Sequence, residues 1–208
     1  HVRDKKGDHC LDVGLYRELL SELDMKVPKL PVQITTEAVG KFSPEEQFEV
    51  VKLVQPEAAS VALIEMMPNI KEPRLAQNFY NFAIENNIQI QHILYSVEDL
   101  KLFKKAIELK VIPKKNLQVL YVLGRYDKNF QSKKEDLDLF LEEHKNIISE
   151  IDWGICAFGR AETDCLIKSN LHGGKVRVGF ENNFYNQNGT VASSNAERVA
   201  EVSKLINA

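Results

Sequence analysis

Lys175-Val176-Arg177-Val178-Gly179-Phe180-Glu181-Asn182-Asn183 is the stretch that decides the fold of this chain. Apolar and polar residues alternate from position 176 to position 181, and this period of two predicts a β-strand over 175–181. The two asparagines that close it are typical turn residues. Arg177 and Glu181 lie four positions apart, so both side chains leave the same face of the predicted strand. A solvated surface strand explains that pair equally well when the stretch is taken alone.

Similar short apolar or alternating runs precede this stretch, and they predict strands at 32–36, 59–65, 88–95, 117–123 and 153–158. Segments with apolar residues at helical spacing separate these runs. Apolar strands that alternate with amphipathic helices are typical of a parallel sheet covered by helices. The sequence lacks the GxGxxG and P-loop patterns of nucleotide-binding open sheets. We therefore predict an α/β fold, a (β/α)8 TIM barrel, as a single domain over residues 1–208.

The segment His1-Val2-Arg3-Asp4 has the pattern expected at the end of a further strand. With one more β/α unit upstream, it would bring the number of strands to eight. We therefore expect the first strand or so of the barrel to be missing from this chain.

Composition narrows the class of protein. A formal net charge of -3 over 208 residues gives no field that would recruit nucleic acid or an anionic membrane. No apolar run approaches the ~18 residues of a membrane span. The three cysteines show no CxxC spacing, and an odd number favours free thiols in a reducing compartment. We therefore expect a cytoplasmic protein that acts on small molecules.

Polar residues cluster where the predicted strands end. In a barrel of this class the carboxyl ends of the strands share one mouth, where reactive groups gather. Solvated loop positions are the alternative explanation for each residue taken singly. The residues in question are His1, Thr35, Thr36, Glu37, Glu65, Gln91, Arg177, Glu181 and Asn182.

His1 and Glu181 are the sharpest pair in this set. A neutral imidazole and a carboxylate from two strand ends are ordinary ligands of a divalent transition metal, usually zinc. Two ligands are one too few, so the missing upstream strand would have to supply a third. If only the spacing of these residues is considered, the alternative is that they bind no metal.

Several segments resemble the β-keto acid cleavage enzyme family. The most specific is Gly173–Asn183, which matches the RVGxEDN motif of the family, and residues 1–4 match the second half of its HxHxRD motif. Segments 32–36, 56–61, 158–160 and 194–199 follow in family order. Together these segments span essentially the whole chain.

The resemblance implies a TIM barrel that carries zinc, with His1, Glu181 and a histidine before the start of this chain as ligands. It implies a Claisen-type exchange, in which a β-keto acid and acetyl-CoA give acetoacetate and a CoA ester. Arg177 would bind a carboxylate or developing negative charge, while Thr35 and Thr36 would hydrogen-bond the substrate. The family also implies a homo-oligomer, commonly a tetramer.

Four positions depart from the family pattern. Asn182 stands where the family has an acid thought to transfer a proton, and Gln91 stands where it has a glutamate. Glu37 replaces a glycine, and Glu65 begins a bulkier loop than the family has. We expect Glu37, Glu65 and Gln91, like the two threonines, to bind the substrate. We therefore expect an altered substrate, with Glu37, Glu65 or an upstream acid taking over proton transfer. The alternative is a divergent barrel that binds a metal or a small carboxylic acid without CoA-dependent chemistry.

Overall fold

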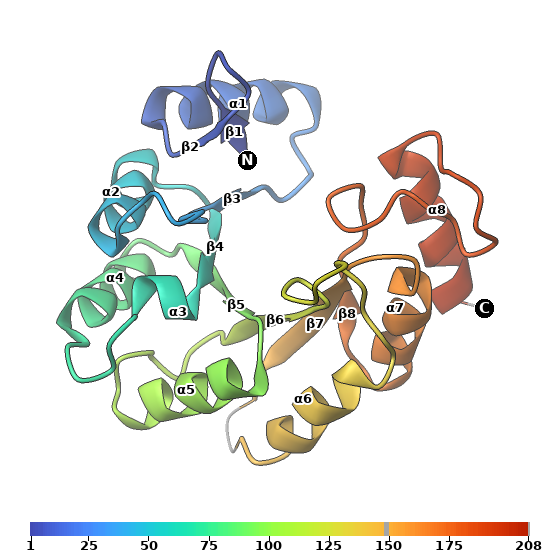
Figure 1. The fold of residues 1–208 in the computed structure, drawn as a ribbon. Coiled ribbons are helices and arrows are strands. Elements are labelled where there is room, and N and C mark those ends of the chain that lie inside the picture. Colours follow the sequence, from blue (N-terminus) through green and yellow to red (C-terminus); the bar gives the residue numbers. More distant parts are fainter. Residues whose placement is uncertain (148–149, 208) are drawn as a thin grey trace. The chain divides into compact units, whose positions relative to one another are not determined.

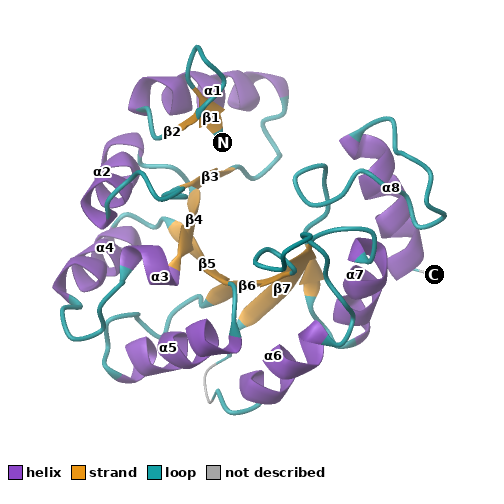
Figure 2. Cartoon of the chain, viewed as in Figure 1, coloured by secondary structure: helices purple, strands orange, loops and turns teal. Residues whose placement is uncertain are grey.

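The computed structural model describes residues 1–147 and 150–207, and they form two compact units. The first unit holds His1–His92 and Phe103–Leu117. The second holds Ile93–Leu102 and the chain from Gln118 onward. Both units contain helices and strands (Figures 1 and 2).

The first unit begins with an antiparallel hairpin and continues with parallel strands and helices. Its parallel strands β3 and β4 pair with Ile34 opposite Ala59. The elements are β1 Val2–Arg3, β2 His9–Cys10, α1 Val13–Lys26, β3 Gln33–Thr35, α2 Pro44–Val54, β4 Ala58–Ala62, α3 Leu63–Met66 and α4 Arg74–Glu85. The strand β5 Gln89–Leu94 and the helix α5 Val97–Glu108 each have residues in both units.

Local sequence explains where the helices of the first unit begin. Asp12 caps α1 by accepting a hydrogen bond from the backbone of Leu15. Ser43 and Glu46 form a reciprocal capping box at the start of α2, with a proline at the first helical turn. The apolar faces of the helices then bury aromatic side chains. The ring of Phe79, fully buried, meets the edge of the Phe48 ring at a centroid distance of 5.5 Å.

The second unit contains three adjacent parallel strands with helices packed against them. Gly154 of β7 pairs with Lys175 of β8, and a Cβ atom at position 154 would lie only 2.9 Å from the Lys175 carbonyl oxygen. This close approach requires glycine. The elements are β6 Gln118–Leu123, α6 Asp136–His144, β7 Asp152–Ala157, α7 Glu162–Leu171, β8 Lys175–Val176 and α8 Asn195–Ile206.

Among the described residues, the parallel strands are hydrogen-bonded in the order β3-β4-β5-β6-β7-β8, which is their order in the chain. The predicted α/β class with a parallel sheet is confirmed. Residues 1–4 do not join this sheet, because Val2 and Arg3 pair with β2 in a separate two-stranded sheet. No helix of the described chain is long and apolar enough to cross a membrane.

Two strands end several residues before their patterns predict. The strand predicted over 59–65 ends at Ala62, and Glu65 lies in the short helix α3 instead. The strand predicted over 175–181 ends at Val176. Beyond it, the N–H groups of Asn182 and Asn183 donate to the Gly179 carbonyl and turn the chain. In both segments the sequence pattern typical of a strand therefore extends beyond the last residue of the strand.

His144, at the end of α6, packs against the sheet of the second unit. Its Nδ1 lies 2.6 Å from the hydroxyl of Tyr121, and its ring lies 5.7 Å from that of Trp153. Burial lowers the pKa of His144 below the ordinary value of 6.5. His144 therefore binds a proton less readily in the folded chain than in the unfolded chain.

We expect this histidine to make stability fall in mild acid. As the pH drops below 6.5, the unfolded chain gains a proton that His144 in the folded chain does not take up, so the free energy of unfolding should decrease. The His144→Gln variant should lose less stability over that range, as measured by urea unfolding at several pH values. His172→Gln, at an exposed position, is the control. Equal pH slopes for wild type and His144→Gln would contradict this prediction.

Candidate functional site

The hairpin of β1 and β2 brings two histidines together in the first unit. Arg3 pairs with His9 in antiparallel register. The Asp4 carboxylate accepts two backbone hydrogen bonds across the turn, and Gly7 adopts φ +86°, a conformation that favours glycine. The ring centroids of His1 and His9 consequently lie 5.3 Å apart.

Glu37, which follows β3, contacts both histidines. Its Oε2 lies 3.7 Å from His1 Nδ1, and its backbone carbonyl oxygen lies 2.9 Å from His9 Nε2. The backbone N–H of Glu37 donates to Thr35 Oγ1. Across the described residues, His1, His9 and Glu37 form a group whose ligand atoms all lie within 4.8 Å of one another. Two imidazoles and a carboxylate are donors that suit a divalent transition metal.

Thr35 and Thr36 are buried and bonded to neighbouring protein groups. The Thr36 hydroxyl lies 3.1 Å from the Ser60 carbonyl oxygen, to which it can donate. The Thr35 carbonyl accepts a hydrogen bond of 2.9 Å from the buried Tyr16 hydroxyl. These bonds hold the end of β3 in place beside Glu37. The binding of substrate by the two threonines stays a prediction.

Glu65 approaches the same segment from α3. Its Oε2 accepts a hydrogen bond of 2.9 Å from the backbone N–H of Ala38, the residue after Glu37. Burial raises the pKa of Glu65, the hydrogen bond from Ala38 acts against that rise, and the negative charge of Glu37 adds to it. A half-buried carboxyl group with a raised pKa is a candidate for proton transfer.

Arg177, Glu181 and Asn182 lie in the second unit. Arg177 forms an ion pair with Glu181 at 3.5 Å, and Cys156 is buried. The side chain of Glu181 is 55% exposed. Asn182 is buried, and its amide nitrogen has no hydrogen-bond partner among the residues that the structure describes.

The structure thus groups part of the predicted site within each unit. His1, Thr35, Glu37 and Glu65 are connected in the first unit, and Arg177 is connected to Glu181 in the second. His1 and Glu181 belong to different units, and their joint role as metal ligands stays a prediction. Gln91 is the third residue of β5 rather than its last, and its role in binding substrate is likewise untested.

His9 is the site residue that the sequence analysis did not single out. The signal that could have found it is the glycine at position 7, which favours a turn between two short segments that each carry a histidine. A hairpin over residues 2–10 would have predicted that His1 and His9 are close. The prediction that residues 1–4 end a barrel strand is incompatible with this hairpin.

The fold is similar to that of a solved enzyme. A 1.95 Å crystal structure of the type I 3-dehydroquinate dehydratase from Clostridium difficile matches with a TM-score of 0.64. The match has 12% sequence identity and covers 94% of this chain and 75% of that one. At this identity the likeness concerns the fold alone, and it places the chain in the predicted TIM-barrel class.

Sequence comparison identifies the family. The profile of the beta-keto acid cleavage enzyme family matches residues 1–208. Two relatives, from Fusobacterium nucleatum subsp. nucleatum and Acetoanaerobium sticklandii, are each named 3-keto-5-aminohexanoate cleavage enzyme. Each is 26% identical over 214 residues that cover 99% of this chain, and 74% and 75% of the respective relatives. The chain therefore belongs to the β-keto acid cleavage enzyme family, as its motifs predicted.

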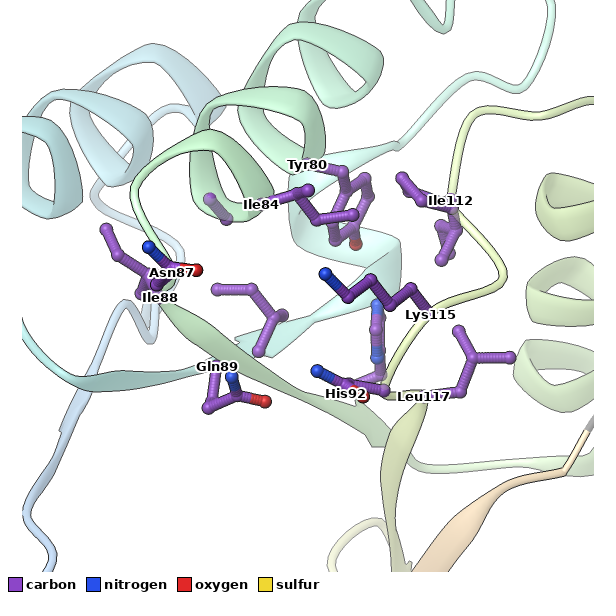
Figure 3. A pocket seen from close by; sticks show the side chains of 13 residues that line it. Tyr80, Ile84, Asn87, Ile88, Gln89, His92, Ile112, Lys115 and Leu117 are labelled. Carbon is purple, nitrogen blue, oxygen red and sulfur yellow. The ribbon is translucent and has the colours of Figure 1, made fainter.

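A separate cavity lies in the first unit, between α4, the start of β5 and the segment 112–117 (Figure 3). The volume of this cavity is about 50 Å³, which is enough for a few water molecules. Tyr80 and His92 face this space, with their ring centroids 5.2 Å apart. The cavity borders the amino-terminal start of β5, whereas reactive groups of a barrel gather at the carboxyl ends.

We expect Tyr80→Phe to leave stability within about 1 kcal/mol of wild type, on the stabilising side. The Tyr80 hydroxyl is buried without a hydrogen-bond partner among the described residues, so its removal sacrifices no protein bond. The control is Tyr16→Phe, which removes the hydrogen bond to the buried Thr35 carbonyl and should cost about 1–3 kcal/mol. Urea unfolding measures both. A loss at Tyr80 as large as that at Tyr16 would show that the cavity holds an ordered partner for the hydroxyl.

Proposed function

We propose that this protein exchanges acyl groups between a β-keto acid and acetyl-CoA, which gives acetoacetate and a new CoA ester. The observation that carries the proposal is the family match over residues 1–208. In this exchange one carbon–carbon bond forms and one breaks, while one thioester is cleaved and another is made. The proton that leaves the carbon between the keto and carboxylate groups returns to acetoacetate. The reaction therefore needs no oxidant or reductant.

The proposal includes a divalent metal, zinc by the family resemblance, with His1 and Glu181 among its ligands. When bound, such an ion polarises the keto oxygen of a substrate and offsets the negative charge that develops there. Support for a metal comes from the first unit, where His1 lies within ligand distance of a second imidazole and a carboxylate. Mixed nitrogen and oxygen donors of this kind suit zinc and its neighbours in the periodic table.

Arg177 is the residue that we propose to bind the carboxylate of the β-keto acid. Its planar guanidinium can form two parallel hydrogen bonds to a carboxylate. In the described chain it already pairs with Glu181 at 3.5 Å, and 39% of its side chain is exposed. A substrate carboxylate could therefore join this pair from solvent. Thr35 and Thr36 would orient the substrate beside Glu37.

Proton transfer falls to Glu65 in this proposal. Asn182 can donate hydrogen bonds through its amide, but it cannot accept a proton at neutral pH. Glu65 is a carboxyl group held in place by the Ala38 N–H, next to the segment that carries Glu37. The departures at Glu37, Gln91 and Asn182 also lead us to propose a β-keto acid different from the one named for the relatives.

The CoA co-substrate needs cationic groups for its phosphates. Arg125 lines a hollow of about 380 Å³ in the second unit, which Lys133 and Ser96 also line. The guanidinium of Arg125 lies over the rings of Phe130 and Phe158, at 5.5 and 5.6 Å from their centroids. A cation beside aromatic rings and an open hollow supports binding of a nucleotide-bearing thioester there.

We also propose, from the family resemblance, that the protein is cytoplasmic and forms a homo-oligomer, commonly a tetramer. Light scattering would measure the mass of the oligomer.

A second candidate function is favoured by Asn182. A buried amide in place of the proton-transferring acid suits a barrel that binds a metal or a small carboxylic acid without CoA-dependent chemistry. Bound metal without acetoacetate formation would select this alternative.

The test is metal content and turnover of the purified full-length protein. We expect one zinc per chain, its loss in Glu181→Ala, and acetoacetate when a panel of β-keto acids is supplied with acetyl-CoA. Mass spectrometry detects acetoacetate and the new CoA ester together. Absence of both metal and acetoacetate from a normally folded protein would contradict the proposal.

A further inference from the structure

We propose that Glu162 positions the turn that carries Glu181, and that Arg198 holds Glu162 in place. The turn is the segment 179–183, which follows β8 and Arg177. The inference rests on the proposed function for the chemistry at Arg177 and Glu181, and on the contacts of the second unit for the positioning. Glu162 is thus a positioning residue, which acts through the turn and not on the substrate.

The turn lies beyond the last residue of β8, so the sheet does not fix it. The N–H groups of Asn182 and Asn183 donate to the Gly179 carbonyl at 3.0 and 3.2 Å, within the turn itself. A backbone bond from the Gly159 N–H to the Asn182 carbonyl, at 3.1 Å, joins the turn to the segment after β7. The orientation of the Glu181 side chain therefore also depends on the side chains that contact the turn.

Asn183 ties the turn to α7 in the protein interior. Its Nδ2 donates to Glu162 Oε2 at 3.2 Å and to the Tyr185 carbonyl at 2.8 Å. The Tyr185 N–H donates in return to Asn183 Oδ1 at 3.1 Å. Because Asn183 and Glu162 are both buried, water cannot readily replace the bond between them. A second side-chain bond to the turn, from the Phe180 N–H to Asn195 Oδ1, is exposed to water.

Arg198 of α8 fixes the Glu162 carboxylate. Its Nη2 donates at 2.8 Å to Glu162 Oε2, the same oxygen that accepts from Asn183. Both charged side chains are fully buried, and bonds between charged groups are stronger than neutral ones. α7 and α8 lie side by side (Figure 1), and apolar side chains of similar volume would join these helices equally well. The ion pair supplies something that apolar packing lacks, which is a fixed acceptor for the turn.

Arg177 and Glu181 depend on this support, because both side chains are partly exposed. Their exposed fractions are 39% and 55%, and 3.5 Å separates the charged groups. An ion pair this exposed contributes little to holding its own geometry. A displacement of about 1 Å at a reacting site can cost on the order of 100-fold in rate. A turn released from Glu162 should therefore lower kcat/KM in a protein that stays folded.

Two variants of the full-length protein test the inference without any turnover. Asn183→Ala removes the bond to Glu162 and leaves the Arg198–Glu162 pair in place, whereas Glu162→Gln removes the carboxylate. In both, hydrogen exchange measured by NMR should be on the order of 10-fold faster at the Asn182 N–H. The Val202 N–H of α8 serves as the internal reference, since a general loss of stability would raise exchange at both amides.

Steady-state kinetics with the same variants tests the consequence for the reaction. The kcat/KM for acetoacetate formation should fall about 10–100-fold in Asn183→Ala. The double variant Glu162→Gln with Asn183→Ala should lose little more than Glu162→Gln alone, because both changes remove the same bond. Asn170→Ala is the matched control and should behave as wild type does. It removes an exposed side chain that bonds the Ile206 carbonyl from the other end of α7.

Circular dichroism and urea unfolding establish that the variants fold. Unchanged exchange at Asn182 in folded Asn183→Ala and Glu162→Gln would overturn the inference. Faster exchange at Asn182 with a wild-type kcat/KM would overturn it as well, because the position of the turn would then not matter to the reaction. If exchange rose as expected but wild type made no acetoacetate, the positioning of the turn would stand and the proposed function would fail.

Discussion

The Glu65→Gln variant is expected to lose about 10²–10⁴-fold in kcat for acetoacetate formation, with a much smaller change in KM. The exchange requires a group that removes a proton from the substrate and returns it to the product. Glu65 is a half-buried carboxyl group whose Oε2 is fixed by the Ala38 N–H at 2.9 Å. The amide oxygen of glutamine can accept the same hydrogen bond but cannot take up a proton. The local structure should therefore survive while proton transfer is lost.

Glu49→Gln provides the matched control. Glu49 is exposed on α2 and pairs with Lys52 at 3.3 Å, so its replacement should leave kcat unchanged. Steady-state rates for wild type and both variants, with one β-keto acid and acetyl-CoA, decide the matter. An unchanged kcat in Glu65→Gln would assign proton transfer to another group.

Replacing Arg198 by methionine should lower the free energy of unfolding by about 3–5 kcal/mol. Arg198 on α8 is fully buried, and its Nη2 donates to Glu162 Oε2 at 2.8 Å and to Thr163 Oγ1 at 2.9 Å. Burial raises the pKa of Glu162, and hydrogen bonds from Arg198 and Asn183 act against that rise. Without the arginine, the buried carboxyl group of Glu162 loses its counter-charge. Removing only one partner of a buried ion pair is strongly destabilising, because the other charge stays buried without compensation.

The double variant Glu162→Gln with Arg198→Met separates this cause from lost packing. Removing both charges should recover much of the stability, because the stranded carboxylate is gone. Lys204→Met, at an exposed position of the same helix, should stay within about 0.5 kcal/mol of wild type. Urea unfolding measures all three variants. Equal losses in the single and double variants would show that packing, not charge, holds α8 to α7.

The sequence predicted the α/β class because hydrophobic periodicity reports which residues are buried. The runs at 117–123 and 153–158 became β6 and β7 within a residue at each end. The run at 175–181 failed, because the Gly179 carbonyl accepts bonds from the next turn and the Asn195 side chain takes the Phe180 N–H. Alternation describes side chains, whereas a strand depends on backbone partners that periodicity does not specify.

Only part of the site could be predicted, because local sequence patterns do not specify contacts between distant residues. Glu37 and Glu65 were identified as polar residues near strand ends, and both lie there, although α3 rather than β4 carries Glu65. The missing element was His9. Its contact with Glu37 spans 28 positions and depends on how the β1–β2 hairpin lies against the residue after β3. No local pattern encodes such a contact.

The most direct test of the central claim is an isotope measurement. The full-length protein would be supplied with an unlabelled β-keto acid and acetyl-CoA that carries ¹³C at both acetyl carbons. The account predicts acetoacetate labelled at its keto and methyl carbons, together with an unlabelled CoA ester of the remaining acyl group. Labelled acetate without labelled acetoacetate would contradict it, because the acetyl group would then have been hydrolysed rather than exchanged.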